Sequence, residues 1–315
     1  MWRARPSAKT PNLALVLPAA HAGAAEAGGV EGAALRKNPP NLALVLPAAH
    51  AGAADGSTLS VILIDNQVVH YEALGHGQPI LFLHGWLGSW RYWLPTMERV
   101  AEHYRTYSFD FWGFGESQRK EVQESIATYV AQVIRFLDQL GIDRVTLVGH
   151  SMGGMVALAT ALSHPERISR LVTVGAPIDG NSLAWPLKLT DRPFFAYAFA
   201  RMPWLRRRLF YFFLGVTQEL PVGEMVADSV KSSADTLRRT VGSMWRTNLQ
   251  PYLTDLHVPA LIVHGAQDNV VNPNQLDLFD QVGMARVVRI PRSRHFPFLD
   301  QPELFDDTLL RFLRA

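Results

Sequence analysis

The chain has 315 residues, of which 48% are hydrophobic and 18% charged, a composition typical of a globular protein with a large core. The net charge of +2 gives no argument for nucleic-acid binding, and the lack of cysteine excludes disulfides, thiol catalysis and thiolate metal sites. No apolar run approaches the ~18 residues of a membrane-spanning helix, and the histidines do not follow a metal-ligand spacing.

An internal repeat sets the first 57 residues apart from the rest of the chain. Residues 11–25 read PNLALVLPAAHAGAA, and residues 40–54 repeat them letter for letter. Two units are too few for a solenoid, and the segment is rich in Ala, Gly and Pro, so we expect residues 1–57 to be poorly ordered. A short apolar stretch near the start resembles a secretory signal but is broken by Pro18. We therefore favour a cytoplasmic or membrane-peripheral location, with secretion as the alternative.

From residue 58 onward, strand and helix patterns alternate. Residues 61–72 predict an antiparallel pair of strands that turns around Asn66. The apolar residues of 125–140 follow helical spacing, and the pattern ends at Gly141. Further strands are expected at 79–83, 144–148, 171–174, 259–263 and 286–290, and further helices at 154–162 and 302–313. This alternation predicts an α/β fold with a mainly parallel sheet and helices on both faces.

The alternation stops between residues 177 and 256, which we interpret as a helical lid inserted into a core of residues 58–176 and 257–315. This lid is unusually aromatic, with ten aromatic residues between positions 185 and 213. One interpretation is a packed lid core beside a solvated basic patch at Arg206, Arg207 and Arg208. The other is an apolar substrate pocket together with a basic amphipathic helix that touches anionic lipid. The residues expected to line such a pocket are Trp185, Phe194, Phe195, Trp204 and Phe212.

A G-x-S-x-G motif spans residues 149–153, with Ser151 at its centre. A β-branched run precedes the motif and an apolar helical run follows it, and this order of strand, sharp turn and helix is the context of a nucleophile elbow. The turn places the serine Oγ at the N-terminus of a helix, where the dipole and free N–H groups favour developing negative charge. Ser151 is therefore the candidate nucleophile, and the neighbouring His150 is expected to point away from it.

A nucleophilic serine needs a base, and the base needs an orienting carboxylate. Asp268 comes a few residues after the expected strand at 259–263, and His295 follows the one at 286–290. Ser151, Asp268 and His295 thus occur in the chain order that this kind of site uses, each past the carboxyl end of an expected strand. We expect Asp268 to orient His295, and His295 to act as the base.

The oxyanion formed by a serine nucleophile needs hydrogen-bond donors. The loop at residues 84–88 reads HGWLG, and its glycines permit a tight turn after an expected strand. One backbone N–H of this loop and that of the residue after the nucleophile would bind the oxyanion. The candidate donors are the N–H groups of Trp86 and Met152. His84 and His264 precede glycines where strands end, and we interpret both as structural.

With these motifs in place, the chain resembles the α/β-hydrolase superfamily, in particular its serine esterases, lipases and carbon–carbon bond hydrolases. The resemblance spans residues 58–315 and rests on the motifs at 84–86, 110–117 and 149–154, with Asp268 and His295. It implies that Asp110 is structural and that a serine at the elbow argues against haloalkane dehalogenases and epoxide hydrolases. It also implies an alternative position for the acid, after the preceding strand, which Asp179 occupies here.

Together these features predict a serine hydrolase that needs no cofactor or metal. We expect its substrate to be a small carboxylic ester with a hydrophobic acyl or alcohol part, lipid-like in character, and we expect no nucleic-acid partner. By the resemblance, the same site could serve a carbon–carbon bond hydrolase for vinylogous diketones or a cofactor-free perhydrolase. A catalytically silent hydrolase fold that acts as a ligand receptor is the alternative from another functional class.

Overall fold

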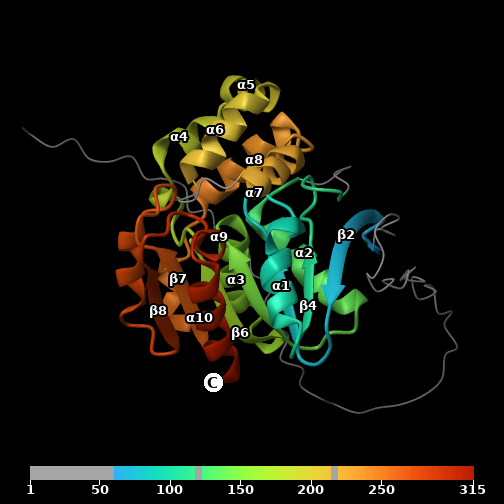
Figure 1. The fold of residues 1–315 in the computed structure, drawn as a ribbon, viewed down its shortest axis with the longest axis vertical. Helices are drawn as coiled ribbons and strands as arrows, with labels where there is room; N and C mark the ends of the chain where they lie inside the picture. The colour runs from blue at the N-terminus through green and yellow to red at the C-terminus, as the bar shows by residue number, and fades with distance from the viewer. Residues whose placement is uncertain (1–59, 118–122, 214–218) are drawn as a thin grey trace, which may run out of the picture. The chain divides into compact units, whose positions relative to one another are not determined.

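The computed structural model describes residues 60–117, 123–213 and 219–315, apart from the side chains of residues 219–222. The segment that we expect to be poorly ordered, residues 1–57, lies outside the described residues. Within them, eight strands form one central sheet in the order β1-β2-β4-β3-β5-β6-β7-β8 (Figure 1). The strands are β1 (Val61–Ile64), β2 (Gln67–Leu74), β3 (Pro79–Leu83), β4 (Arg105–Phe109), β5 (Val145–His150), β6 (Ile168–Val174), β7 (Ala260–Gly265) and β8 (Ala285–Ile290).

The sheet is mainly parallel, as the alternating pattern predicts. β1 pairs antiparallel with β2, and β2 antiparallel with β4, whereas every other pair is parallel. Asp65 and Asn66 form the turn between β1 and β2 with φ angles of 50° and 60°, the left-handed conformation that a two-residue hairpin turn requires. β5 and β7 are buried along their whole length, because helices cover the sheet on both faces.

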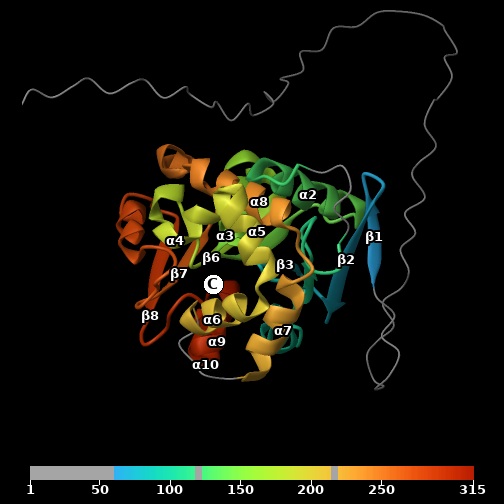
Figure 2. The ribbon, with the colours of Figure 1, turned by 90° about the horizontal axis from the view of Figure 1, so that it is seen from above.

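Helices of the core lie on both faces of the sheet (Figure 2). α2 and α3 pack against each other, and α1 packs against α10. α3 packs on β5 and β6 and also contacts α2 and the segment 250–255, which explains why its sequence is apolar all round. These helices are α1 (Leu94–Val100), α2 (Ile126–Gln139), α3 (Met152–Ser163), α9 (Pro297–Asp300) and α10 (Pro302–Arg314). None of the helices in the described ranges is both long enough and apolar enough to span a membrane.

Between β6 and β7 the chain forms a group of helices, which we call the inserted helices. Figure 1 shows them gathered beyond one end of the sheet. They are α4 (Trp185–Lys188), α5 (Pro193–Arg201), α6 (Pro203–Phe213), α7 (Glu219–Ser229) and α8 (Ala234–Arg246). Short 3-10 turns complete the described chain at η1 (Trp90–Trp93), η2 (Pro165–Arg167), η3 (Gly180–Ser182), η4 (Leu189–Asp191), η5 (Gln250–Asp255) and η6 (Pro273–Phe279).

Arg206 is buried among the inserted helices, so the expectation that it belongs to a solvated basic patch is wrong. Its Nε donates a hydrogen bond to Phe199 O at 3.1 Å, and its terminal nitrogens donate to Ala200 O and Ser229 O. These carbonyls lie at the C-terminal ends of α5 and α7, where a cation stabilises the helix dipole. Burial lowers the pKa of Arg206 from its ordinary value. Arg206 therefore joins three helices, whereas Arg207 and Arg208 are exposed.

Candidate active site

Ser151 occupies a strained turn between β5 and α3. Its φ of 51° lies in the left-handed region, which costs energy for a residue with a side chain. The close approach of strand and helix requires glycine on both sides of the serine. A Cβ on Gly149 would lie 2.2 Å from Gly153 O, and a Cβ on Gly153 would lie 2.4 Å from Leu83 O. The motif therefore folds as the elbow that the sequence predicts, with Ser151 at the N-terminus of a buried helix.

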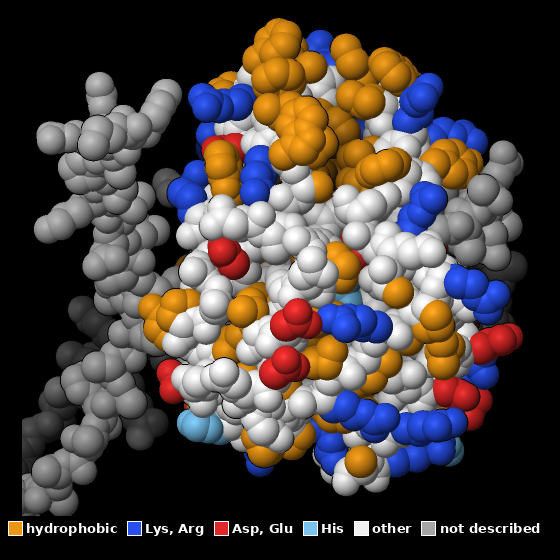
Figure 3. Space-filling view, turned by 90° about the vertical axis from the view of Figure 1, so that its left-hand side faces the viewer, with side chains coloured by type: hydrophobic (Ala, Val, Ile, Leu, Met, Phe, Trp, Pro, Cys, Tyr) orange, Lys and Arg blue, Asp and Glu red, His pale blue; other side chains and the backbone are white. Residues whose placement is uncertain are grey.

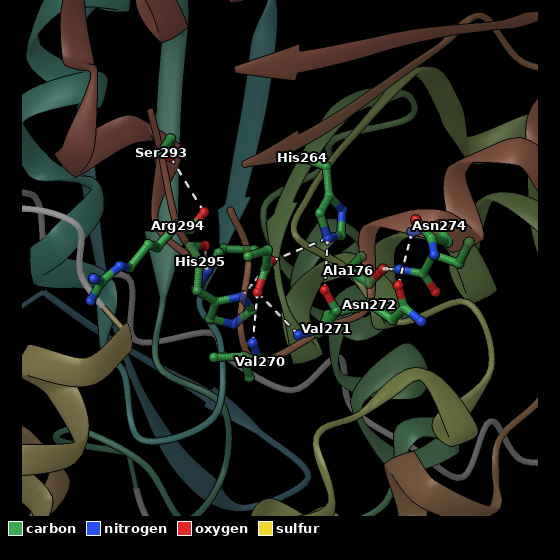
Figure 4. A network of polar contacts seen from close by, with 12 residues as sticks. Ala176, His264, Val270, Val271, Asn272, Asn274, Ser293, Arg294 and His295 are labelled. Carbon is green, nitrogen blue, oxygen red and sulfur yellow. Dashed lines mark hydrogen bonds and ion pairs between the residues drawn. The ribbon is translucent and has the colours of Figure 1, made fainter. Parts of the chain in front are cut away.

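The structure brings His295 and Asp268 together at the ends of β8 and β7. His295 Nδ1 lies 2.9 Å from Asp268 Oδ2, as expected for an imidazole N–H that donates to a carboxylate. The other carboxylate oxygen, Oδ1, accepts hydrogen bonds from Val270 N at 2.8 Å and Val271 N at 3.0 Å. Figure 4 shows dashed contacts from the labelled residues Val270, Val271 and His264 that converge on one carboxylate. Both side chains are buried, so the pair is held in a fixed orientation.

Several contacts keep Asp268 ionised. Burial by itself would raise its pKa, but the adjacent His295 and the hydrogen bonds from His264 and His295 outweigh burial and hold the pKa well below its ordinary range. The alternative acid, Asp179, is placed differently. Its carboxylate caps η3 by accepting a hydrogen bond from Asn181 N at 3.0 Å. Of the two candidate acids, Asp268 is therefore the one that contacts His295.

Two further histidines lie closer to this centre than the sequence suggests. His264 Nε2 lies 3.1 Å from Asp268 Oδ2 and 3.2 Å from Val271 O, so it is a second N–H donor to the carboxylate (Figure 4). His150 does not point away from the site. Its ring centroid lies 4.7 Å from that of His295, and its Nε2 donates to His295 O at 3.0 Å.

These contacts were missed because they are made across the fold. His264 precedes Asp268 by four positions, past a glycine that looks like an ordinary strand exit, and this spacing is the one signal that could have indicated its contact with the acid. For His150, adjacent to Ser151, the sequence carries no sign of the loop that will pack against it. His84 is structural, as expected: it donates from Nδ1 to Gly85 O at 2.8 Å and accepts at Nε2 from Phe111 N at 3.0 Å.

The two candidate oxyanion donors lie on the segments that the sequence assigns to them. Met152 is the first residue of α3, directly after Ser151, and Trp86 is in the loop that follows β3. That loop turns tightly, with Gly88 N donating to Gly85 O at 3.0 Å. Asp110 stabilises the segments around Trp90 and Glu116, because its carboxylate accepts hydrogen bonds from Trp90 N at 2.8 Å and Glu116 N at 2.9 Å. Its role is thus structural, as the resemblance implies.

A small cavity is lined by Ser151 and His295. Its volume is about 20 Å³, which is room for about one water molecule. The sheet end contributes part of its wall, and α4, α6 and α8 contribute the rest. The lining residues are Trp86, His150, Ser151, Leu187, Phe210, Phe213, Met244, Val270, His295 and Phe296.

The five aromatic residues expected to line this pocket do not line it, so that expectation is corrected. All five are exposed: Trp185, Phe194, Phe195, Trp204 and Phe212. The reason is helix orientation. α6 turns Phe210 and Phe213 toward the cavity, which leaves Phe212 on the outer side, and α5 buries Ala196 and Phe199 instead of Phe194 and Phe195. The lining is aromatic, as expected, but a different set of side chains provides it.

The C-terminal end of α6 is bonded to both loops that carry the candidate base and acid. Phe213 O accepts a hydrogen bond from His295 N at 3.2 Å. Phe212 O accepts from Asn269 Nδ2 at 2.7 Å and from an Arg294 guanidinium nitrogen at 3.2 Å. Any displacement of α6 would therefore act directly on the loops of His295 and Asp268.

A family model described as the alpha/beta hydrolase fold matches residues 78–302, which is more than half of the chain. The chain belongs to this family. The geometry above is thus that of an α/β hydrolase with a serine at its elbow.

Curated relatives of this α/β hydrolase include two kinds of hydrolase. A 2-hydroxy-6-oxo-2,4-heptadienoate hydrolase of Pseudomonas putida is 28% identical over 251 residues, which cover 71% of this chain and 87% of the relative. A pimeloyl-acyl-carrier-protein methyl ester esterase of Pectobacterium carotovorum is 27% identical over 259 residues, which cover 78% and 99%. Among solved structures, an enol-lactonase from Burkholderia xenovorans superposes with a TM-score of 0.70 at 21% identity, covering 81% of this chain and all of that one.

Proposed function

We propose that this α/β hydrolase is a serine esterase for carboxylic esters with a hydrophobic acyl or alcohol part. The observation that carries the proposal is the convergence of three candidate groups. Ser151 and His295 line the same buried cavity, and Asp268 Oδ2 lies 2.9 Å from Nδ1 of His295. A nucleophile, a base and an orienting acid in this arrangement suit acyl transfer.

In the proposed mechanism, Ser151 Oγ attacks the ester carbonyl carbon while His295 Nε2 takes the serine proton. The N–H groups of Trp86 and Met152 bind the oxyanion of the tetrahedral intermediate. His295 then protonates the leaving alcohol, and water releases the acyl group from Ser151 by the same proton transfers in reverse. Asp268 keeps the Nδ1 proton of His295 in place and stabilises the imidazolium that forms in each half-reaction.

The cavity wall supports a neutral, apolar substrate. Most of its lining side chains are aromatic or aliphatic, and none of the ten lining residues, all within the described part of the chain, is a lysine or arginine. A substrate carboxylate brought against this wall would find no lysine or arginine among the lining residues, and burial of an unpaired charge is costly. An ester whose acyl or alcohol part is hydrophobic has no such cost.

Carbon–carbon bond hydrolysis is the second candidate, and it is favoured by the relative from Pseudomonas putida whose name describes a dienoate hydrolase. Such a reaction would use the same serine, histidine and aspartate. The apolar wall described above favours the ester, because a dienoate brings a carboxylate.

The test is turnover on a panel of p-nitrophenyl esters from acetate to palmitate, run beside a ring-fission dienoate. We expect ester hydrolysis in the wild type and a loss of at least about 10³-fold in Ser151→Ala. Circular dichroism would verify that the variant is folded. Ester turnover that survives in folded Ser151→Ala would reject the proposal, and serine-dependent turnover of the dienoate alone would assign the site to carbon–carbon hydrolysis.

A further inference from the structure

The outer side of α4, α5 and α6 exposes an unusual set of large apolar side chains, which we call the aromatic face. Its members are Trp185, Phe194, Phe195, Tyr197, Met202, Trp204 and Phe212. Phe194 is 76% exposed and Trp185 71%, so most of the surface of each residue is in water. Figure 3 shows hydrophobic side chains gathered over this end of the molecule. Contiguous exposed apolar surface of this kind marks an interaction site.

The charges around the aromatic face are mainly positive. Between positions 192 and 213 the sequence contains five arginines and no aspartate or glutamate. Arg192, Arg201, Arg207 and Arg208 are exposed, and Figure 3 shows basic side chains at the edges of the apolar cluster. Two aspartates that flank these helices in the sequence are each paired with an arginine, Asp191 at 3.5 Å from Arg246 and Asp235 at 3.8 Å from Arg238. The partner that complements this surface is therefore apolar at its centre and anionic at its edge.

We propose that the aromatic face docks onto an anionic lipid bilayer. Tryptophan, tyrosine and phenylalanine enter the boundary between head groups and acyl chains, where their rings leave water. Exposed arginines beside them bind lipid phosphates, each contributing favourably near a negatively charged surface. The bilayer supplies both an apolar interior for the aromatic rings and anionic head groups for the arginines.

The same helices connect the bilayer to the cavity. α6 carries Trp204 and Phe212 on its outer side and Phe210 and Phe213 on the cavity wall, and its C-terminal carbonyls bind the loops of His295 and Asp268. α5 buries Phe199, whose ring stacks on Trp86 at 5.7 Å. If the proposed esterase function holds, docking would bring a lipid-phase ester to helices that close the site. Docking itself does not require turnover.

Vesicle flotation of the full chain tests the proposal. The vesicles are phosphatidylcholine alone and phosphatidylcholine with about one third phosphatidylglycerol. We expect flotation with the anionic vesicles, at least about tenfold weaker apparent binding to the neutral ones, and release by high salt, since salt screens surface charge. A wild type that does not float with anionic vesicles would overturn the proposal.

Two double variants probe the two parts of the surface. Phe194→Asp with Trp204→Asp removes apolar contact, and both positions lie in the first turn of a helix, where a carboxylate favours the dipole and preserves folding. Arg192→Glu with Arg208→Glu reverses charge at the edge. Each is expected to weaken binding to anionic vesicles by at least about tenfold.

Matched controls introduce the same acidic residues on other elements. Met284→Asp alters an apolar side chain that is 46% exposed directly before β8, and Arg311→Glu with Arg314→Glu alters α10, whose end lies away from the inserted helices (Figure 1). Both are expected to float like the wild type. Equal flotation of the wild type and the Phe194→Asp, Trp204→Asp protein would overturn the proposal. A wild-type dimer in sedimentation velocity would also overturn the proposal, if this double variant were monomeric and lipid had no effect on the dimer.

Flotation tests the docking surface and turnover tests the esterase proposal, so either proposal can fail without the other. An inactive protein that floats on anionic vesicles would reject the esterase proposal and retain the docking surface. An active esterase that stays with the lipid-free fraction would reject the docking surface and retain the esterase.

Discussion

Asp268 is the residue on which the polar contacts of the candidate site converge. It accepts from two backbone N–H groups and contacts both His295 and His264. Four contacts on one buried carboxylate fix its plane, and with it the ring of His295. The contacts with His295 and His264 hold its pKa well below the ordinary range, so the carboxylate stays charged at neutral pH.

Asp268→Asn is therefore expected to lower kcat by roughly 10⁴-fold, because an amide cannot hold His295 in the tautomer that leaves Nε2 free to accept a proton. Asp179→Asn, which changes the residue that caps η3, is the matched control and should stay within a few-fold of the wild type. Steady-state kinetics on a p-nitrophenyl ester would decide between them. Loss of kcat in Asp179→Asn alone would mean that Asp179, and not Asp268, is the acid that orients His295.

For single residues, the sequence predicts features that depend on neighbouring positions and misses contacts between distant segments. Ser151 can be predicted because its motif and its flanking strand and helix are contiguous, and its backbone φ of 51° follows from that context. Asp268 and His295 can be predicted because each follows a strand. The contacts of His264 and His150 depend on how separate loops pack, and short-range pattern does not encode that packing.

At the scale of the element, α6 separates two environments with one short helix. Phe213 lines the cavity and is 8% exposed, whereas its neighbour Phe212 is 55% exposed on the aromatic face. The composition of this segment predicts an apolar helix near a substrate pocket. It does not reveal which aromatic residues face inward, because nearly every position around the helix is apolar or an arginine.

Phe213→Ala is expected to enlarge the cavity and move the preferred ester toward longer acyl chains, while Phe212→Ala keeps the wild-type preference. The chain-length profile on p-nitrophenyl esters measures the shift. Loss of a buried phenylalanine costs up to about 3–5 kcal/mol, so thermal unfolding must accompany the assay. Identical profiles for the two folded variants would contradict the assigned wall.

Arg206→Met offers a second test among the inserted helices. It removes three hydrogen bonds that the buried guanidinium donates to helix-end carbonyls, and we expect a loss of about 2–4 kcal/mol in the free energy of unfolding. Arg208→Met, at an exposed position two residues on, should change it by no more than about 0.5 kcal/mol. Urea unfolding would compare the two, and equal effects would contradict a bonding role for Arg206.

For the whole molecule, the sequence predicts the fold well because α/β alternation is a repeated, strong signal. The sheet, its antiparallel start and its covering helices all follow from hydrophobic pattern. Element ends are less certain: β6 begins at Ile168 rather than at residue 171, since Ser169 and Arg170 interrupt the apolar run. The composition also does not predict which histidines the fold buries in their neutral form.

His84 illustrates the effect of these histidines on stability. Burial lowers its pKa from 6.5 to about 4. Between those values the unfolded chain binds a proton that the folded chain does not, so stability rises with pH, by about 1.4 kcal/mol per pH unit for this group. That contribution is complete above the unfolded value and is lost as the pH falls toward 4.

His84→Gln should therefore reduce the slope of unfolding free energy against pH across this window by about 1.4 kcal/mol per unit. His103→Gln, at an exposed position, is the control and should keep the wild-type slope. Urea unfolding at a series of pH values gives both slopes. A slope in His84→Gln equal to that of the wild type would show that His84 is not buried in its neutral form.

The most direct test of the central claim is to identify the residue that a fluorophosphonate modifies. Peptide mass spectrometry after partial labelling would locate the adduct, and residual ester turnover would be measured on the same samples. We predict one adduct, on Ser151, with turnover lost in proportion to its occupancy. An adduct at another residue, or full turnover with Ser151 completely modified, would contradict the account.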